Sequence, residues 1–204
     1  EARKIQVSPN DFAIKVPRKE ALRVRVMDQV TELVTREAIL ELPAPLGELK
    51  ADPQHDILKV SVISCEGRQF TGLVRGQGLR AGAMATSGAW ETFSTVVVGA
   101  SETDMAMAVN RIFEMGGGIV VCSEGKIQAE LALPVAGLMS NQRIEEIVER
   151  LDQIQAKAKA LGFRFADAAL TLAVLTTAAI PFFRLSEDGL VDSKTGRVVD
   201  LVVP

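Results

Sequence analysis

The chain has 204 residues, 48% of them apolar and 24% charged, and a formal net charge of −3. The length fits one large domain or two small ones, and the composition is ordinary for a soluble globular protein. Because Lys and Arg form no cluster, the sequence excludes a nucleic-acid-binding surface; the most apolar run, residues 170–183, is too short to span a membrane. The chain starts at Glu1 without a signal-like segment, so we expect a fragment or processed chain of a cytoplasmic protein.

Apolar patterns in the N-terminal third of the chain predict β-strands. For residues 34–42, the prolines at positions 43 and 45 favour a strand over a helix. We expect residues 1–36 to form N-terminal strands that can belong to a neighbouring β-sandwich, and residues 37–204 to form the main domain. The predicted strands are 11–16, 22–30, 34–42, 57–64 and 70–74.

Two glycine-rich stretches do not fit phosphate-binding loops. Residues 75–83 lack the G-x-G-x-x-G spacing, and no strong helix follows them. The triplet at residues 116–118 follows a helix and precedes a strand, the reverse of the order that phosphate binding requires. We therefore expect residues 75–83 to be a bent connection in which backbones approach closely.

The best-defined pattern runs from Ser94 to Ser140. Residues 95–98 predict a buried strand, and Ser101 predicts the N-cap of a helix, with Asp104 in the capping-box position. Gly116 predicts the end of that helix. The expected buried face of the helix consists of Met105, Ala108, Val109, Ile112 and Phe113.

A β-hairpin is predicted after this helix, with arms at residues 119–122 and 127–133 and a turn at Glu124-Gly125. Alternation in the second arm places one set of apolar residues on a single face: Ile127, Ala129, Leu131 and Leu133. A loop at residues 134–140 should follow.

A long helix should begin after a cap at Ser140 or Asn141 and end at Gly162. Residues 167–177 predict a second, buried helix, and residues 182–185 and 198–203 predict closing strands joined by a polar turn. The buried stripe expected for the long helix is Ile144, Ile147, Val148, Leu151, Ile154, Ala158 and Leu161. Frequent hairpins predict an α+β fold, with a mixed, largely antiparallel sheet packed with about three helices.

The chain contains few of the residue types that metal sites and nucleophilic catalysis require. Cys65 and Cys122 fall in predicted strands, and two reduced, buried thiols are favoured over a disulfide. His55 is the only histidine, so the chain alone cannot build a multi-histidine metal site. We interpret His55 as an isolated surface residue and predict no catalytic residue and no metal ligand in this chain.

Five phrases, in order, carry a family resemblance: DILKVSV, GLVRGQGLRAGAMA, VVVGASETDMAMAVNRIFEMGGGIVV, GKIQAELALPVAGLMS and GLVD. Taken together, these phrases resemble the C-terminal domain of bacterial adenine deaminases, which belong to the amidohydrolase superfamily. The resemblance extends from about Phe12 to Val203. The stretch from Asp104 to Ser140 is its most specific part.

The resemblance implies a metal-dependent parent enzyme that deaminates adenine to hypoxanthine and ammonia. A separate (β/α)8 barrel would carry the metal ligands, with Mn or Fe as the divalent ion, so no cofactor is expected on this chain. The implied partner is the barrel of the same parent, in a cytoplasmic homo-oligomer without nucleic acid or membrane.

The sequence departs from the family at one segment, where the family typically reads His-Asp-Ser-His-Asn. Here the matching positions hold Trp90, Glu91, Thr92, Phe93 and Ser94. Both histidines are replaced by aromatic residues that cannot bind a metal, whereas Glu91 keeps an acceptor and Thr92 keeps a hydroxyl. We predict these five residues to line a pocket, and a substrate other than adenine stays open.

Two other functions compete with the accessory-domain hypothesis. The chain can be a non-catalytic assembly or small-molecule-binding module in which Trp90 holds a planar ligand. A third interpretation is an independent hydrolase that uses Glu91 and Thr92.

Overall fold

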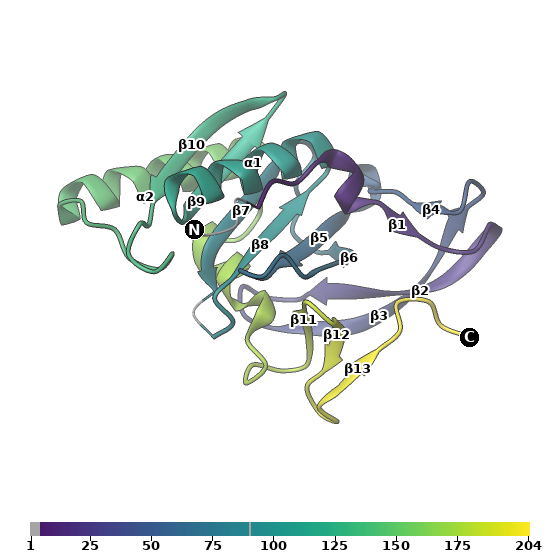
Figure 1. The fold of residues 1–204 in the computed structure, drawn as a ribbon. Coiled ribbons are helices and arrows are strands. Elements are labelled where there is room, and N and C mark those ends of the chain that lie inside the picture. Colours follow the sequence, from purple (N-terminus) through teal and green to yellow (C-terminus); the bar gives the residue numbers. More distant parts are fainter. Residues whose placement is uncertain (1–4, 90) are drawn as a thin grey trace.

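The computed structural model describes residues 5–89 and 91–204, and its centre is an eight-stranded sheet (Figure 1). The strand order is β10-β9-β7-β8-β5-β6-β2-β3, and the neighbours are antiparallel except for β2 and β6. These findings confirm the α+β class with a largely antiparallel sheet. The strands of this sheet are β2 (Lys19–Gln29), β3 (Thr35–Ala44), β5 (Ile57–Ile63), β6 (Gln69–Arg75), β7 (Ala83–Ala89), β8 (Ser94–Gly99), β9 (Gly118–Ser123) and β10 (Lys126–Ala132).

Helices cover both faces of the sheet. Helix α1 (Glu102–Met115) packs its apolar side against β7, β8 and β9 on one face. On the other face lie α2 (Ile144–Ala160), α3 (Ala168–Ala173) and the C-terminal hairpins. Strands β5, β8 and β9 are buried along their whole length. Apolar runs fit this burial in β8 and β9, whereas β5 also buries Lys59 and Ser61.

Helix α1 follows its predicted pattern closely. The Ser101 hydroxyl accepts the backbone N–H of Asp104 at 3.3 Å, and Gly116 ends the helix at φ 73°. The reciprocal half of the expected capping box is replaced, because the Asp104 carboxylate accepts the N–H of Gly125 in the β9–β10 turn at 2.9 Å. The cap thus joins the helix to the hairpin that follows it.

The glycine-rich connection at residues 75–83 is tightly packed against other backbone, as predicted. A Cβ on Gly76 would lie 2.3 Å from the carbonyl oxygen of Gln29, and one on Gly78 would lie 2.7 Å from that of Gly162. The Asp56 carboxylate accepts the N–H groups of both glycines, at 2.9 and 2.7 Å. These glycines therefore allow close backbone contact.

A β-bulge corrects the predicted alternation of the second hairpin arm. The register of β10 against β9 shifts between Ile127 and Ala129. Because one extra residue reverses the side to which the strand's side chains point, Ile127 packs with the α1 cluster while Ala129 and Leu131 pack on the opposite face.

Helix α2 differs from its prediction in both cap and stripe. Arg143 occupies the N-cap position and makes no capping side-chain bond, so neither Ser140 nor Asn141 is the cap. Ile154 and Ala158 are buried as predicted, and Ile147 is half-buried against the core. The other stripe residues of the first half are exposed: Ile144, Val148 and Leu151. The reason is positional, since α2 extends past the edge of the structure that it covers (Figure 1).

The C-terminal part forms a separate three-stranded sheet of β11 (Phe183–Ser186), β12 (Gly189–Asp192) and β13 (Arg197–Val199). Strand β12 lies where the sequence indicated only a polar turn. Its apolar part is only two residues long, Leu190 and Val191, and the flanking glycine and aspartate are typical turn residues. The predicted helix at 167–177 is α3 followed by a 3-10 turn, Val174–Thr176, and Asp167 caps it.

The N-terminal part is more irregular than predicted. A 3-10 turn (Pro9–Phe12) and the short β1 (Ile14–Lys15), which pairs with β4 (Glu48–Leu49), replace the expected strand at 11–16. The boundary at residue 36 stays a prediction; β2 and β3 pair with each other across it.

The two cysteines are free, but they are not both buried. Cys122 is buried in β9, as predicted, whereas Cys65 is exposed in the turn between β5 and β6. The prediction of a second buried thiol was wrong because the apolar run of β5 ends at Ile63, before the cysteine.

Candidate functional site

The turn between β7 and β8 carries the residues predicted to line a pocket. Trp90 lies outside the described residues, so the 91–94 turn is the part that can be placed. The backbone N–H of Phe93 donates to the Ala89 carbonyl at 2.9 Å, and Phe93 has φ 53°, which is uncommon for an aromatic residue. Its ring is 60% exposed at this end of the sheet.

The hydroxyl groups of this turn have partners within the protein. The Thr92 hydroxyl donates to the Thr176 hydroxyl at 3.3 Å, and the buried Ser94 hydroxyl donates to the Thr92 carbonyl at 3.3 Å. Glu91 is exposed. The turn therefore presents a carboxylate and an aromatic ring outward, while its hydroxyls hold its shape.

Beneath the turn lies a buried guanidinium that sequence reasoning missed. Arg184 is 1% exposed, and it donates to the carbonyl oxygens of Ile180 at 2.6 Å, Leu33 at 2.7 Å and Pro181 at 2.7 Å. Burial lowers the pKa of Arg184 to about 10, against the opposing influence of the Glu91 carboxylate. Arg184 thus stays charged at neutral pH and fixes the β2–β3 turn and the segment before β11 next to the 91–94 turn.

The single histidine lies at the other end of the sheet from this turn. His55 precedes β5, whose first residues pair near the end of β8, whereas Ile63 at the far end of β5 pairs with Thr95. The His55 Nδ1 atom is 2.6 Å from the Asp52 carboxylate, and the ring is exposed. Since seven strand residues span roughly 20 Å, His55 cannot assist Glu91.

The donor set does not fit a catalytic metal centre. Within residues 5–89 and 91–204, no group of three or more His, Cys, Asp or Glu side chains is arranged to hold a metal ion. Hydrolytic metal sites generally use several such ligands around one ion. The 91–94 turn contributes one carboxylate and no imidazole, so we derive no metal-dependent step from this chain.

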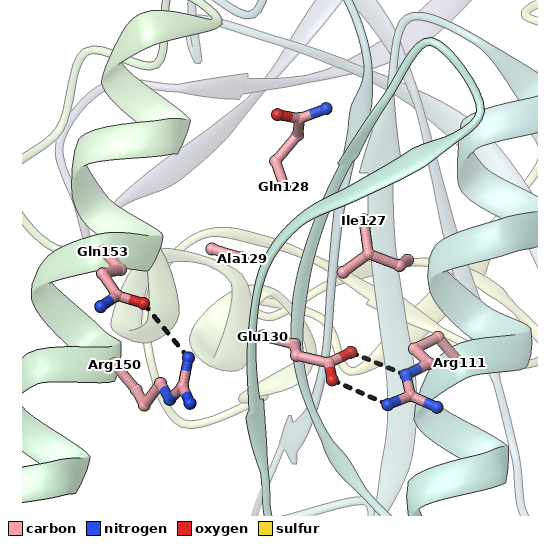
Figure 2. A pocket seen from close by; sticks show the side chains of 7 residues that line it. All are labelled: Arg111, Ile127, Gln128, Ala129, Glu130, Arg150 and Gln153. Atoms are coloured by element: carbon pink, nitrogen blue, oxygen red, sulfur yellow. Dashed lines mark hydrogen bonds and ion pairs between the residues drawn. The ribbon is translucent and has the colours of Figure 1, made fainter.

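A hollow of 530 Å³ lies elsewhere, at the outer edge of the sheet (Figure 2). Its lining residues come from β10 and from the helices on either side of that strand, α1 and α2. The Arg111 guanidinium binds both Glu130 oxygens at 2.7 Å, while Arg150 bonds to Gln153 on α2 at 3.3 Å. None of the side chains that line this hollow belongs to the 91–94 turn.

The Arg111–Glu130 pair is structural. Its two parallel bonds are the strong bidentate type, and they lower the pKa of the Glu130 carboxyl and raise that of Arg111. Because Glu130 occupies the guanidinium, this arginine is not free to bind an anion. The pair joins residues 19 positions apart, so helical spacing alone could not have revealed it.

Comparison with known proteins supplies the family. A family model described as "Adenine deaminase C-terminal domain" matches residues 32–197. The chain belongs to this family. Among curated relatives, the adenine deaminase of Clostridium botulinum (strain Langeland) is 35% identical over 98% of this chain, and that of Archaeoglobus fulgidus is 39% identical over 96%. The one from Kosmotoga olearia is 38% identical over 84%.

This adenine deaminase C-terminal domain is an accessory part of a longer kind of protein. The chain spans about a third of the length of the curated relatives that it matches: 34% of the Clostridium and Archaeoglobus proteins and 30% of the Kosmotoga protein. Helices in the described part of the chain are all too short or too polar to cross a membrane.

Proposed function

We propose that this chain is the C-terminal accessory domain of a metal-dependent, adenine-deaminase-like amidohydrolase. The parent would hydrolyse adenine with water to hypoxanthine and ammonia. The observation that carries the proposal is the family match over residues 32–197, in a chain whose described residues hold no group of three or more potential metal ligands. The metal, Mn or Fe, would be held by a barrel in the remaining two thirds of the parent, which would act in the cytoplasm as a homo-oligomer.

The test is an adenine deamination assay on the full-length parent and on these 204 residues, each supplied with Mn²⁺ or Fe²⁺. The proposal predicts ammonia release by the parent and none by the fragment. Turnover by the fragment alone would overturn it. A parent that binds metal but deaminates only another purine would show that the proposed substrate is wrong, while the accessory role of this chain would stand.

Within this function, the positions from Trp90 to Ser94 would line the substrate pocket of the parent. Support comes from the exposure of Glu91 and Phe93 and from the buried Arg184, which holds the surrounding segments in place. Glu91→Gln in the parent should raise the KM for the purine more than it lowers kcat, because it removes an acceptor for the amino group. Glu66→Gln, in the exposed β5–β6 turn, is the matched control; equal KM values for both variants would remove Glu91 from the pocket.

The alternative is a non-catalytic assembly or small-molecule-binding module. The exposed apolar residues in the first half of α2 favour assembly. The single tryptophan gives a simple discriminator, since a fluorescence change on titration with purines would favour ligand binding. A stable oligomer without any purine response would favour assembly.

A further inference from the structure

The first half of α2 presents an apolar face that nothing in the described chain covers. Ile144, Val148 and Leu151 are 65%, 50% and 36% exposed. Their spacing of i, i+4 and i+7 places them on one side of the helix. We call these three residues the α2 face. The second half of the same helix is anchored, because Ile154 is 1% exposed and Ala158 is fully buried.

Two further apolar residues are exposed in the segment before α2. Val135 and Met139, in the segment before α2, are 44% and 58% exposed. Figure 1 shows that the first half of α2 stands out at the left of the molecule, away from the sheet. An exposed apolar group of this kind marks an interaction site more often than an isolated surface residue does.

The rim of the α2 face carries excess negative charge. Two of the four acidic residues between positions 143 and 152, Glu145 and Asp152, flank the face at helical spacing, and both are exposed. The neighbouring Arg143 pairs with Glu145 at 3.4 Å, and Arg150 bonds to Gln153 rather than to a carboxylate. A complementary partner would therefore present an apolar centre with a basic rim.

We propose that the α2 face docks against the catalytic portion of the same parent polypeptide. This inference rests on the proposed function. The curated relatives contain about twice as much additional polypeptide as this chain supplies, so a partner is present in each of them. The docked segment would cover Ile144, Val148 and Leu151 and place basic residues opposite the acidic rim.

The size of the face favours a tethered partner. Eight helical residues, Ile144 to Leu151, span only ~12 Å. Stable interfaces between free proteins bury roughly 800 Å² on each side, which a half-helix of this length does not reach. A covalent linker gives the partner an effective concentration in the millimolar range, at which a small apolar contact is sufficient.

A second copy of this chain fits the face less well. In an antiparallel pair of α2 helices, the acidic edges of the two copies, each with Glu145 and Asp152, would lie side by side. Like charges at such a contact oppose association. Self-association is therefore the competing outcome of the experiment.

Hydrogen–deuterium exchange on the full-length parent tests the proposal. Wild type is compared with the double variant Ile144→Ala/Val148→Ala, with Leu46→Ala, at the exposed tip of the β3–β4 turn, as the control. Because alanine is the better helix former, faster exchange in α2 would reflect lost contacts and not lost helix propensity. We expect amide exchange in residues 144–151 to be at least about tenfold faster in the double variant and unchanged in the control.

Two results would overturn the docking. One is exchange in residues 144–151 that is equally fast in wild type and double variant. The other is protection that disappears when the parent is diluted to a monomer, which would assign the face to a second copy. Adenine turnover by the same wild-type sample is read separately: concentration-independent protection in a parent that does not deaminate adenine would support the docking and reject only the proposed reaction.

Discussion

Helices α1 and α2 have similar apolar stripes in the sequence but very different surroundings in the structure. In α1, the stripe from Met105 to Ile112 is buried against β7, β8 and β9. In α2, the equivalent stripe is buried only from Ile154 onward, and Ile144 is 65% exposed. Periodicity therefore indicates that a helix has a partner, but it does not show that the partner belongs to the same chain.

The two helices also differ at their N-termini. The α1 cap is made by Ser101 and is connected through Asp104 to the next hairpin. Arg143, at the same position in α2, makes no capping bond. The centre of the domain is thus stabilised by a local cap and by extensive packing, whereas the start of α2 lacks a side-chain cap and packs on the core through Ile147. Four predictions test this contrast, from the largest expected effect to the smallest.

The same substitution in both helices should have very different costs in the isolated chain. Ile112→Ala should lower the free energy of unfolding by about 3 kcal/mol, because it leaves a cavity at a side chain that is 1% exposed. Ile144→Ala should change it by less than ~0.5 kcal/mol. Urea denaturation measures both, and equal costs would show that Ile144 is already buried within the chain.

Changing the N-cap residue should also cost more stability in α1 than in α2, although the effect is smaller than that of the core substitution. Ser101→Ala should lower the free energy of unfolding by about 1 kcal/mol, because the N–H of Asp104 loses its acceptor. Arg143→Ser should not destabilise the chain and should raise the helix signal in circular dichroism. A loss of stability in Arg143→Ser would contradict the view that α2 is uncapped.

Acid should weaken the attachment of α1 through Glu102. Burial is the largest single influence and would raise the pKa of this carboxyl. Its bond to the buried Lys59 ammonium at 2.8 Å, a backbone hydrogen bond and the positive charges of Lys59 and Lys50 together outweigh burial, so the pKa lies below the usual 4.5. The stabilisation is present above pH 4.5 and is lost as the pH falls through the lower folded-state pKa. Glu102→Gln should therefore make the acid-side decline in stability shallower, whereas Glu66→Gln, at an exposed site, should leave the slope unchanged.

The reactivity of the two cysteine thiols compares a buried strand with an exposed turn, and it can be measured without changing the sequence. Burial beside Asp104 raises the pKa of the Cys122 thiol to about 12, whereas Cys65 is exposed. Because the thiolate is the reactive form, a disulfide reagent at pH 8 should modify one thiol in the native chain and two in urea. Rapid modification of both thiols in the native chain would show that β9 opens readily.

The sequence was most informative where local signals agreed. Strand β8, helix α1 and the following hairpin were predictable because β-branched runs, a serine cap and glycine turns all indicated the same elements. It was least informative where long-range contacts decide the outcome. The bulge after Ile127 depends on the pairing with β9, and the exposure of Ile144 depends on how far α2 extends beyond the sheet.

The candidate site was predictable only in part. The segment at positions 90–94 was proposed as pocket-lining from the family resemblance, and its described residues, 91–94, follow the end of β7. Arg184 could not be found, because its carbonyl partners come from Leu33, Ile180 and Pro181 and are defined only by the folded backbone. An arginine between apolar residues in a short strand was the only hint.

The most direct test of the central claim, that the hydrolytic metal is held outside these residues, is metal content. The full-length parent and the 204-residue chain would be purified from the same Mn- and Fe-supplemented host and analysed by inductively coupled plasma mass spectrometry. We predict a stoichiometric metal in the parent and no bound equivalent in the chain. A chain that retains an equivalent of Mn or Fe through purification would contradict the account.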